Sequence, residues 1–283
     1  MIEITELHNL NQYANFDTFS YRDKTIILYD DHRCLLTALY EAQRLGIIDN
    51  ETNLVTFDRH DDARPIYENW ELISKFTKIG IDKISQRDFK NFVEFDIREF
   101  DDDWVCVGME LGLINNIVNV GNVDGTNIDN WVNRIYIDKL GRKHLGQVIN
   151  HIPDELSRIG GALGDRVRYN DFKIVRDVLG YNLPGTQDGF ADTETNYVLD
   201  FDLDCFTADC QGRTFAWPEP IFQDIYGYGD NGAGYIMQDV IKRARFITIC
   251  RESSYCGGIG ESNKILAYLD KYFFHDSLGT KSI

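Results

Sequence analysis

Short apolar runs alternate with polar segments along the chain and predict its strands and helices. Residues 25–29 (TIILY), 53–57 (NLVTF) and 197–206 are rich in β-branched and aromatic side chains, and each run has the length of a buried strand. Residues 33–45 (RCLLTALYEAQRL) instead carry leucines at helical spacing and end before Gly46, which favours a helix. A strand, a helix and a strand in this order predict two parallel strands joined by a right-handed crossover.

The remaining pattern predicts more elements of the same two kinds. Helices are predicted over residues 67–79, 82–92, 235–244 and 262–274, and strands over residues 104–107, 134–137 and 245–250. Residues 121–130 and 207–234 have the composition of connections. Residues 139–187 have no clear periodicity, and we expect a lid, an edge excursion or a short hairpin there. The whole pattern therefore predicts one α/β domain over residues 1–283, with a mainly parallel central sheet flanked by helices in three layers.

Composition and charge narrow the class of protein. With a formal net charge of −17, the chain offers little of the clustered Lys and Arg that nucleic acid or an anionic membrane surface requires, so we expect neither as a partner. A cationic substrate suits this charge better. No apolar run reaches the roughly 20 residues of a membrane span, and the acidic first residues do not have the pattern of a secretory signal. Six scattered cysteines are typical of reduced thiols, so we expect a cytoplasmic protein.

Acidic and histidine residues gather at the ends of three predicted strands. Asp30, Asp31 and His32 follow the first strand, the string DRHDD at residues 58–62 follows the second, and the string DFDLD at residues 200–204 lies in the third. Alternate residues of an extended chain point to the same side, and ligands of open parallel sheets bind beyond the carboxyl ends of the strands. We therefore expect one metal site, and its candidate ligands are His32, Asp58, His60, Asp62, Asp202 and Asp204.

Two imidazoles and four carboxylates form a ligand set that needs positive charge. Carboxylates placed side by side repel one another and resist ionisation unless cations neutralise them. Hard oxygen ligands combined with imidazole favour Mn²⁺, with Fe²⁺, Co²⁺ or Zn²⁺ as alternatives. Two such ions about 3.5–4 Å apart can share one water, lower its pKa and direct the resulting hydroxide at a planar carbon or at phosphorus. The set therefore predicts a metal-dependent hydrolase.

The order of these motifs resembles that of the arginase/ureohydrolase superfamily. Its members carry a His after a first strand, a D-x-H-x-D after the next strand and a D-x-D late in the chain, where this chain has Asp31-His32, residues 58–62 and residues 202–204. The strings FDRHDDAR and VLDFDLDCF look closest to those of the arginase-like peptide arginases. The chain departs from the usual pattern before the first Asp-His, where Tyr29-Asp30 stands in place of two glycines. The motifs cover only a small part of the chain.

The resemblance implies an arginase-like fold, two Mn²⁺ ions, with Fe²⁺ or Co²⁺ as alternatives, and hydrolysis of a guanidinium by a hydroxide that bridges the ions. The substrate of the peptide arginases is an arginine residue in a ribosomally made precursor peptide, which becomes ornithine with release of urea. We therefore expect such a peptide as the partner. The spacing allows either Asp200 with Asp202 or Asp202 with Asp204 as the late ligand pair, and the superfamily pattern favours the second. The sequence leaves a homo-oligomer open.

A guanidinium must also be held by a carboxylate, and two late glutamates are candidates for this role. Fork-like pairing with a carboxylate would orient the guanidinium carbon, and the superfamily supplies such a Glu late in the chain. Glu219 in WPEPIF is our first candidate and Glu252 in ITICRESS our second, and we expect Trp217 to pack on the substrate. Arginases also use a His as proton shuttle, but no His lies between residues 61 and 143. The central candidates for a shuttle are His144 and His151, and bulk water or the carboxylate of Glu110 could serve instead.

Three other functions fit the same residues. The metal site could act on a small free guanidino compound, or on an N-formimino or acetyl substrate. A non-catalytic metal-binding interaction module would keep its partner after loss of Asp58 or His60. A metallophosphoesterase is less compatible, because the strand ends offer few Lys or Arg side chains for a phosphate.

Overall fold

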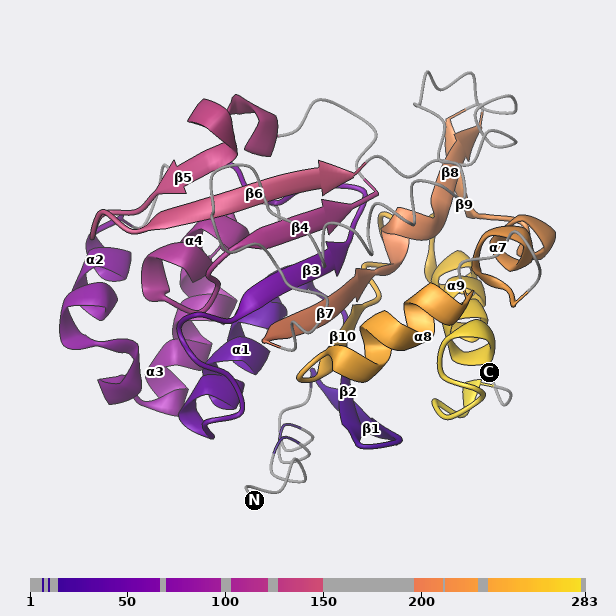
Figure 1. Ribbon diagram of the computed structural model, residues 1–283, viewed down its shortest axis with the longest axis horizontal. Helices are drawn as coiled ribbons and strands as arrows, with labels where there is room; N and C mark the ends of the chain where they lie inside the picture. Colours follow the sequence, from indigo (N-terminus) through magenta and orange to yellow (C-terminus); the bar gives the residue numbers. More distant parts are fainter. Residues whose placement is uncertain are drawn as a thin grey trace.

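The computed structural model describes residues 7, 10, 15–66, 70–97, 103–121, 127–149, 196–210, 212–228 and 234–280 (Figure 1). Its strands are β1 (Asp17–Tyr21), β2 (Lys24–Tyr29), β3 (Asn53–Phe57), β4 (Ile117–Val120), β5 (Ile135–Ile137), β6 (Lys143–Ile149), β7 (Tyr197–Asp202), β8 (Thr207–Cys210), β9 (Arg213–Ala216) and β10 (Ile247–Cys250). Its α-helices are α1 (Leu35–Arg44), α2 (Trp70–Ile79), α3 (Gln86–Asn91), α4 (Trp104–Leu111), α7 (Glu219–Tyr226), α8 (Gly234–Arg243) and α9 (Ile259–Tyr272).

The main sheet runs in the order β1-β2-β10-β7-β3-β4-β6-β5. The pairings from β2 to β6 are parallel, whereas the edge strands β1 and β5 pair antiparallel with β2 and β6. In this order β2, β10, β7 and β3 are neighbours, so the three acidic motifs lie together at the carboxyl ends of these parallel strands. Strands β8 and β9 form a separate hairpin, which Figure 1 shows beyond the end of β7.

Helices cover both faces of the sheet, as Figure 1 shows. Helices α1 to α4 bury their apolar side chains against one face, and α7, α8 and α9 bury theirs against the other. Successive residues of β3 alternate between the two cores, with Leu54 in the first and Val55 and Phe57 in the second. Since both faces of the central strands are buried, their sequences are nearly continuous apolar runs. The predicted α/β fold, with a mainly parallel sheet between helices, is confirmed.

Residues 104–107 begin the helix α4, so the strand predicted there is wrong. All eight residues of α4 (WVCVGMEL) are buried, so the helix has no polar face that would reveal its period in the sequence. Gly108 lets α4 pack closely against α1, because a Cβ atom there would lie 2.6 Å from Ile114 Cδ1 and 3.1 Å from Leu36 Cδ2.

The other predicted elements are confirmed with shifted ends. The predicted helices at residues 67–79, 82–92, 235–244 and 262–274 correspond to α2, a shorter α3, α8 and α9, and the strands at 134–137 and 245–250 to β5 and β10. The predicted connection at residues 207–234 contains β8, β9 and α7, the segment at residues 139–187 contains β6, and residues 150–187 lie outside the described residues. Among the helices that the structure describes, none has both the length and the apolar character needed to cross a membrane.

Candidate metal centre

Three strand ends turn in the same way. Just after β2 and β3, and at the last residue of β7, an aspartate side chain accepts a hydrogen bond from the backbone N–H two residues further on. The aspartates are Asp31, Asp58 and Asp202, and the N···O distances are 3.2, 2.7 and 3.0 Å. Such turns end the extended chain at once. The prediction that residues 58–62 continue as extended chain is therefore wrong, since β3 stops at Phe57.

The first group of ligands surrounds one nitrogen of His32. Its Nδ1 atom lies 3.4 Å from Asp58 Oδ2, 3.0 Å from Asp62 Oδ2 and 3.1 Å from Asp202 Oδ2. His32 belongs to the 3-10 turn η2 (His32–Cys34), which leads from β2 into α1. We call these four residues the inner group.

The second group contains Asp58 again, together with His60 and Asp204, and we call it the outer group. His60 Nδ1 lies 3.0 Å from Asp204 Oδ2, and the ligand atoms of the three residues lie within 4.8 Å of one another. Asp204 stands in the 3-10 turn η7 (Leu203–Phe206) that follows β7. The structure thus brings together all six candidate ligands in two groups that share Asp58.

The state of these side chains fits a site for cations. His32 Nδ1, Asp58 Oδ2 and Asp204 Oδ2 are buried without a hydrogen-bond partner. Burial and the charge of Asp62 raise the pKa of Asp58, while burial and Asp204 raise the pKa of Asp202 to about 7. Without a metal ion, the carboxylates can lower their mutual repulsion by keeping protons or by pairing with protonated imidazoles. Buried nitrogen and oxygen atoms with free lone pairs can instead bind a metal ion.

Asp200 fixes the far side of the His32 ring. Its buried carboxylate lies 2.8 Å from His32 Nε2 and accepts hydrogen bonds from the hydroxyls of Tyr29 (3.0 Å), Thr56 (2.8 Å) and Thr248 (2.6 Å). Thr56, Asp200 and Thr248 stand in register on β3, β7 and β10. A carboxylate at Nε2 holds a ring proton on that nitrogen, so the neutral ring would offer its Nδ1 lone pair to the inner group. Burial alone would lower the pKa of His32, but the charges and hydrogen bonds of Asp200 and Asp202 raise it well above its usual value in the metal-free chain. Asp200 is therefore a hydrogen-bond partner of His32, and it belongs to neither ligand group.

Two further residues support the site, and one of them, Trp104, gave no signal in the sequence. Trp104, the first residue of α4, donates from Nε1 to Asp62 Oδ2 at 2.5 Å, and its ring centroid lies 4.6 Å from that of His32. Asp61 accepts hydrogen bonds from the Asn127 side chain and the Ile128 amide, so it anchors the segment after β4 and points away from the ligands. Only the placement of α4 as a helix brings Trp104 to this position.

Of the two candidate glutamates, the structure brings Glu252 to the cluster. It follows β10, its carboxylate accepts a hydrogen bond from the His32 amide at 3.4 Å, and its ligand atom lies within 4.8 Å of those of Asp202 and Cys250. Burial and the charge of Asp202 raise the pKa of Glu252 to about 10. The backbone of Glu252 has a φ of 27°, a left-handed conformation that is uncommon for a residue other than glycine.

Glu219 and Trp217 are not where the predicted substrate contacts require them. Glu219 begins α7, its carboxylate pairs at 2.6 Å with Lys271, and it belongs to none of the groups that could hold a metal ion. Trp217 is only 1% exposed and donates from Nε1 to the Thr207 carbonyl, so it belongs to the core. The preference for Glu219 over Glu252, and the substrate contact of Trp217, are therefore corrected.

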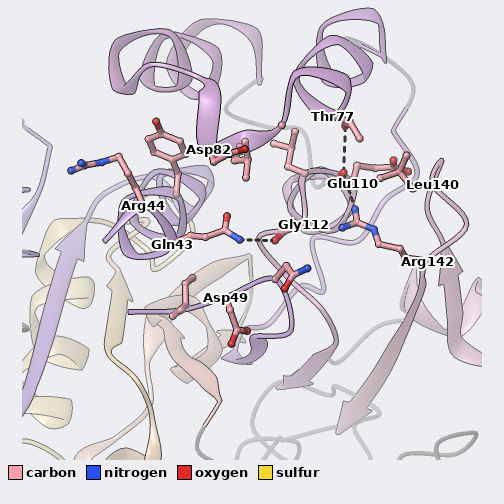
Figure 2. Close-up of a pocket in the computed structure, with 15 residues that line it drawn as sticks. Gln43, Arg44, Asp49, Thr77, Asp82, Glu110, Gly112, Leu140 and Arg142 are labelled. Carbon is pink, nitrogen blue, oxygen red and sulfur yellow. Dashed lines mark hydrogen bonds between the residues drawn. The ribbon is translucent and has the colours of Figure 1, made fainter. Parts of the chain in front are cut away.

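The candidate proton shuttles lie away from the His/Asp cluster or outside the described residues. Glu110 lines a pocket of about 500 Å³ between the C-terminal ends of α1, α2 and α4 and the turn from β5 to β6, shown in Figure 2. This pocket lies at the amino ends of the strands, opposite the cluster, and the Glu110 carboxylate there accepts a hydrogen bond from Tyr136. His144 lies near the start of β6 and contacts the Asn115 carbonyl, and His151 is outside the described residues.

The stability of the metal-free chain should fall as the pH rises. The pKa values of Asp202 (about 7), His60 (about 9) and Glu252 (about 10) lie above the usual values of about 4 to 6.5 for such groups. For His60, the main cause of the raised pKa is the Asp204 carboxylate 3.0 Å from its Nδ1 atom. Between the unfolded and folded pKa values the folded chain binds more protons, so the free energy of unfolding decreases with pH.

Thermal unfolding followed by circular dichroism checks this expectation. With chelator, we expect a lower Tm at about pH 8.5 than at about pH 6. At about pH 8.5, Mn²⁺ at roughly 100 times its Kd should add about 2.7 kcal/mol and raise the Tm by about 5–10 °C. A Tm that Mn²⁺ leaves unchanged at the higher pH would contradict cation binding by the folded cluster.

Comparisons with known proteins do not assign a family to this chain. No protein-family model matches the sequence, and no curated protein matches it. The interpretation of the site therefore depends on the geometry of the described residues, which form a buried His/Asp cluster that could hold a metal ion.

Proposed function

We propose that the chain is a hydrolase that uses two Mn²⁺ ions to convert arginine residues of a precursor peptide to ornithine, with release of urea. The observation that carries the proposal is the pair of ligand groups that share Asp58, with the Glu252 carboxylate beside Asp202. The motif order shared with the ureohydrolases supports the same reaction. We expect a small free guanidino compound to compete with the peptide at lower affinity, because the same cluster would bind its guanidinium.

The inner and outer groups would hold the two ions, and their imidazole and carboxylate ligands suit Mn²⁺. When bound, such ions would supply a nucleophilic oxygen at neutral pH, because divalent cations lower the pKa of water. The side chains of the chain itself would bind and orient the substrate. In the balanced reaction, water adds its oxygen to the guanidinium carbon, the bond from that carbon to Nε breaks, and Nε leaves as the protonated amine of ornithine.

Glu252 is the carboxylate that would hold the guanidinium. It stands next to Asp202, where its oxygens can accept two N–H groups of a planar cation. A bound cation would replace the proton that the raised pKa of Glu252 indicates for the free protein. The guanidinium carbon would thus be fixed on the side of the cluster where β10 ends.

The exposed histidine of the outer group supports a substrate presented by a peptide, although Asp58 and Asp204 are buried. The His60 side chain is 50% exposed, and the ring of Tyr255, 40% exposed, lies with its centroid 6.0 Å from the His60 ring. An arginine side chain can reach such a surface site while the peptide backbone stays outside. Tyr255 follows Glu252 in the same loop and would contact the aliphatic part of that side chain.

Urea release measured with three substrates side by side tests the proposal. The substrates are a peptide with one internal arginine, free arginine and agmatine, each with Mn²⁺ and with chelator. We expect Mn²⁺-dependent urea and an ornithine residue in the peptide, and no product from the same peptide with citrulline at that position. Turnover of free arginine or agmatine alone would exclude the peptide substrate, and absence of urea from all three would leave a non-catalytic metal module.

A further inference from the structure

The hairpin of β8 and β9 connects two parts of the candidate site. Its first strand begins at Thr207, three residues after the candidate ligand Asp204, and the Thr207 hydroxyl donates to the Asp204 carbonyl at 2.6 Å. Its second strand ends at Ala216, whose backbone N–H donates at 2.9 Å to the side chain of Glu261 in the first turn of α9. The hairpin therefore begins at the outer group and ends against the start of α9, to which the loop after β10 leads.

Arg59, which lies between two candidate ligands of the outer group, binds one side of this hairpin. Its guanidinium donates through Nη1 to the Thr207 hydroxyl at 3.4 Å and through Nη2 to Asp209 Oδ2. The other carboxylate oxygen of Asp209 accepts a hydrogen bond from the Thr214 hydroxyl on β9 at 2.6 Å. Asp209 thus joins Arg59 to both strands of the hairpin.

The loop at residues 251–258, which follows β10, contacts the other side of the hairpin. Gly257 has a φ of 88° and lies so close to β9 that a Cβ atom there would be 2.1 Å from the Thr214 carbonyl oxygen. Glycine permits both this backbone conformation and this close approach. Within the loop, the Cys256 amide donates to the Glu252 carbonyl at 3.2 Å. Gly257 therefore couples the position of Glu252 to that of β9.

We infer that the β8–β9 hairpin positions Glu252 relative to the outer group: Arg59 and Asp209 are positioning residues, and Gly257 is the point at which the hairpin holds the loop. This inference rests on the proposed function, which assigns the guanidinium to Glu252. Reacting atoms must meet at about 3–3.5 Å, and a misplacement of about 1 Å can lower a rate about 100-fold. The hairpin would keep the carboxylate that orients the cation at a fixed place relative to the side chains that hold the metal ions.

The ion pair of Arg59 and Asp209 acts on the geometry of the site more than on folding. The two side chains are 23% and 49% exposed, and an ion pair with this exposure contributes little to stability. Loss of the pair should therefore change the Tm by less than about 4 °C. A large loss of activity without a loss of folding is the signature that we expect for a positioning pair.

Two glycine variants test the contact between the loop and the hairpin. Gly257→Ala should lower kcat for the arginine peptide by about 10–100-fold and leave both Mn²⁺ ions bound. The matched control is Gly258→Ala, because Gly258 also has a positive φ, of 108°, but a Cβ atom there has no neighbour within 4 Å. This control should keep kcat within about threefold. Equal losses in the two variants, or a normal kcat in Gly257→Ala, would overturn the inference.

A double-mutant cycle tests the pair at the other side of the hairpin. Arg59→Met and Asp209→Asn should each lower kcat by about 5–20-fold with KM within about threefold, and the double variant should lose no more than the single ones. Arg59→Lys should recover part of the loss. Asp239→Asn, the control, removes an exposed ion pair with Arg243 on α8 and should change kcat less than twofold. Multiplying losses in the double variant, or loss of Mn²⁺ in Arg59→Met, would overturn the inference.

Hydrogen exchange of the Mn²⁺-loaded full-length chain separates this inference from the proposed function. The amides of residues 251–258 should exchange about 10-fold faster in Gly257→Ala and in Asp209→Asn, with no change in β2 or α1. Faster exchange of this loop in a chain that releases no urea would support the role of the hairpin and contradict the proposed reaction. Unchanged exchange together with unchanged kcat, in a chain that releases urea, would overturn the inference and support the reaction.

Discussion

Asp58→Asn is expected to lower kcat/KM for an arginine peptide by at least about 1000-fold, which corresponds to about 4 kcal/mol of transition-state stabilisation. Asp58 is the residue that both ligand groups share. Its Oδ1 atom already accepts the His60 amide at 2.7 Å, and its Oδ2 atom is buried without a partner beside His32. An asparagine has one acceptor oxygen, so it must turn an N–H₂ group either to the His60 amide or to the cations. Either orientation weakens both metal positions.

Metal content by mass spectrometry, urea release and thermal unfolding should be measured on the same preparation of Asp58→Asn. We expect fewer than two Mn²⁺ ions per chain. The matched control is Asp82→Asn, which makes the same chemical change at an exposed carboxylate of the pocket opposite the cluster and should keep activity within about twofold. A variant at Asp58 that retains two ions and normal turnover would show that this carboxylate only caps the turn after β3.

The strand ends could be predicted from the sequence, because a buried parallel strand has a local signature. Residues 53–57 are mostly apolar and buried on both faces, and the charged string begins at the next residue. The rule that ligands bind beyond the carboxyl ends of parallel strands then brings Asp58 and Asp202 together. The different positions of Asp200 and Asp202 became clear only from the register between the strands. Asp200 lies beside Thr56 and Thr248 within the sheet, and such cross-strand neighbours cannot be read from one strand alone.

The choice between Glu219 and Glu252 shows where local reasoning failed. Glu252 follows β10, so the same rule about strand ends would have favoured it, but the neighbourhood of Trp and Pro drew attention to Glu219. Between β7 and Glu219 the chain forms the β8–β9 hairpin, and α7 then packs against α9. Trp104 was missed for a different reason. A fully buried helix has no polar face, so its apolar run resembles a strand, and the contact of its first residue with Asp62 depends on that helix.

Glu252→Gln is expected to lower kcat/KM for the arginine peptide by about 100-fold or more, because it removes the charge from a group proposed to hold a guanidinium. Truncating one partner of a buried, hydrogen-bonded charge pair costs about 2–5 kcal/mol. Gln keeps the shape of Glu but cannot accept two N–H groups of the cation. Unlike the change at Asp58, this substitution should leave both Mn²⁺ ions bound, since Glu252 lies outside the inner and outer groups.

The separate values of kcat and KM decide what Glu252 does. If its carboxylate binds the guanidinium equally in the ground state and the transition state, KM rises and kcat is kept; if it mainly orients the carbon for attack, kcat falls as well. Glu219→Gln is the matched control, because it makes the same change at a carboxylate that pairs with Lys271 instead. Its effect should stay within about twofold, since an exposed ion pair contributes little to stability. Equal losses in the two variants would remove the special role of Glu252, and with it the reason for placing a guanidinium at the end of β10.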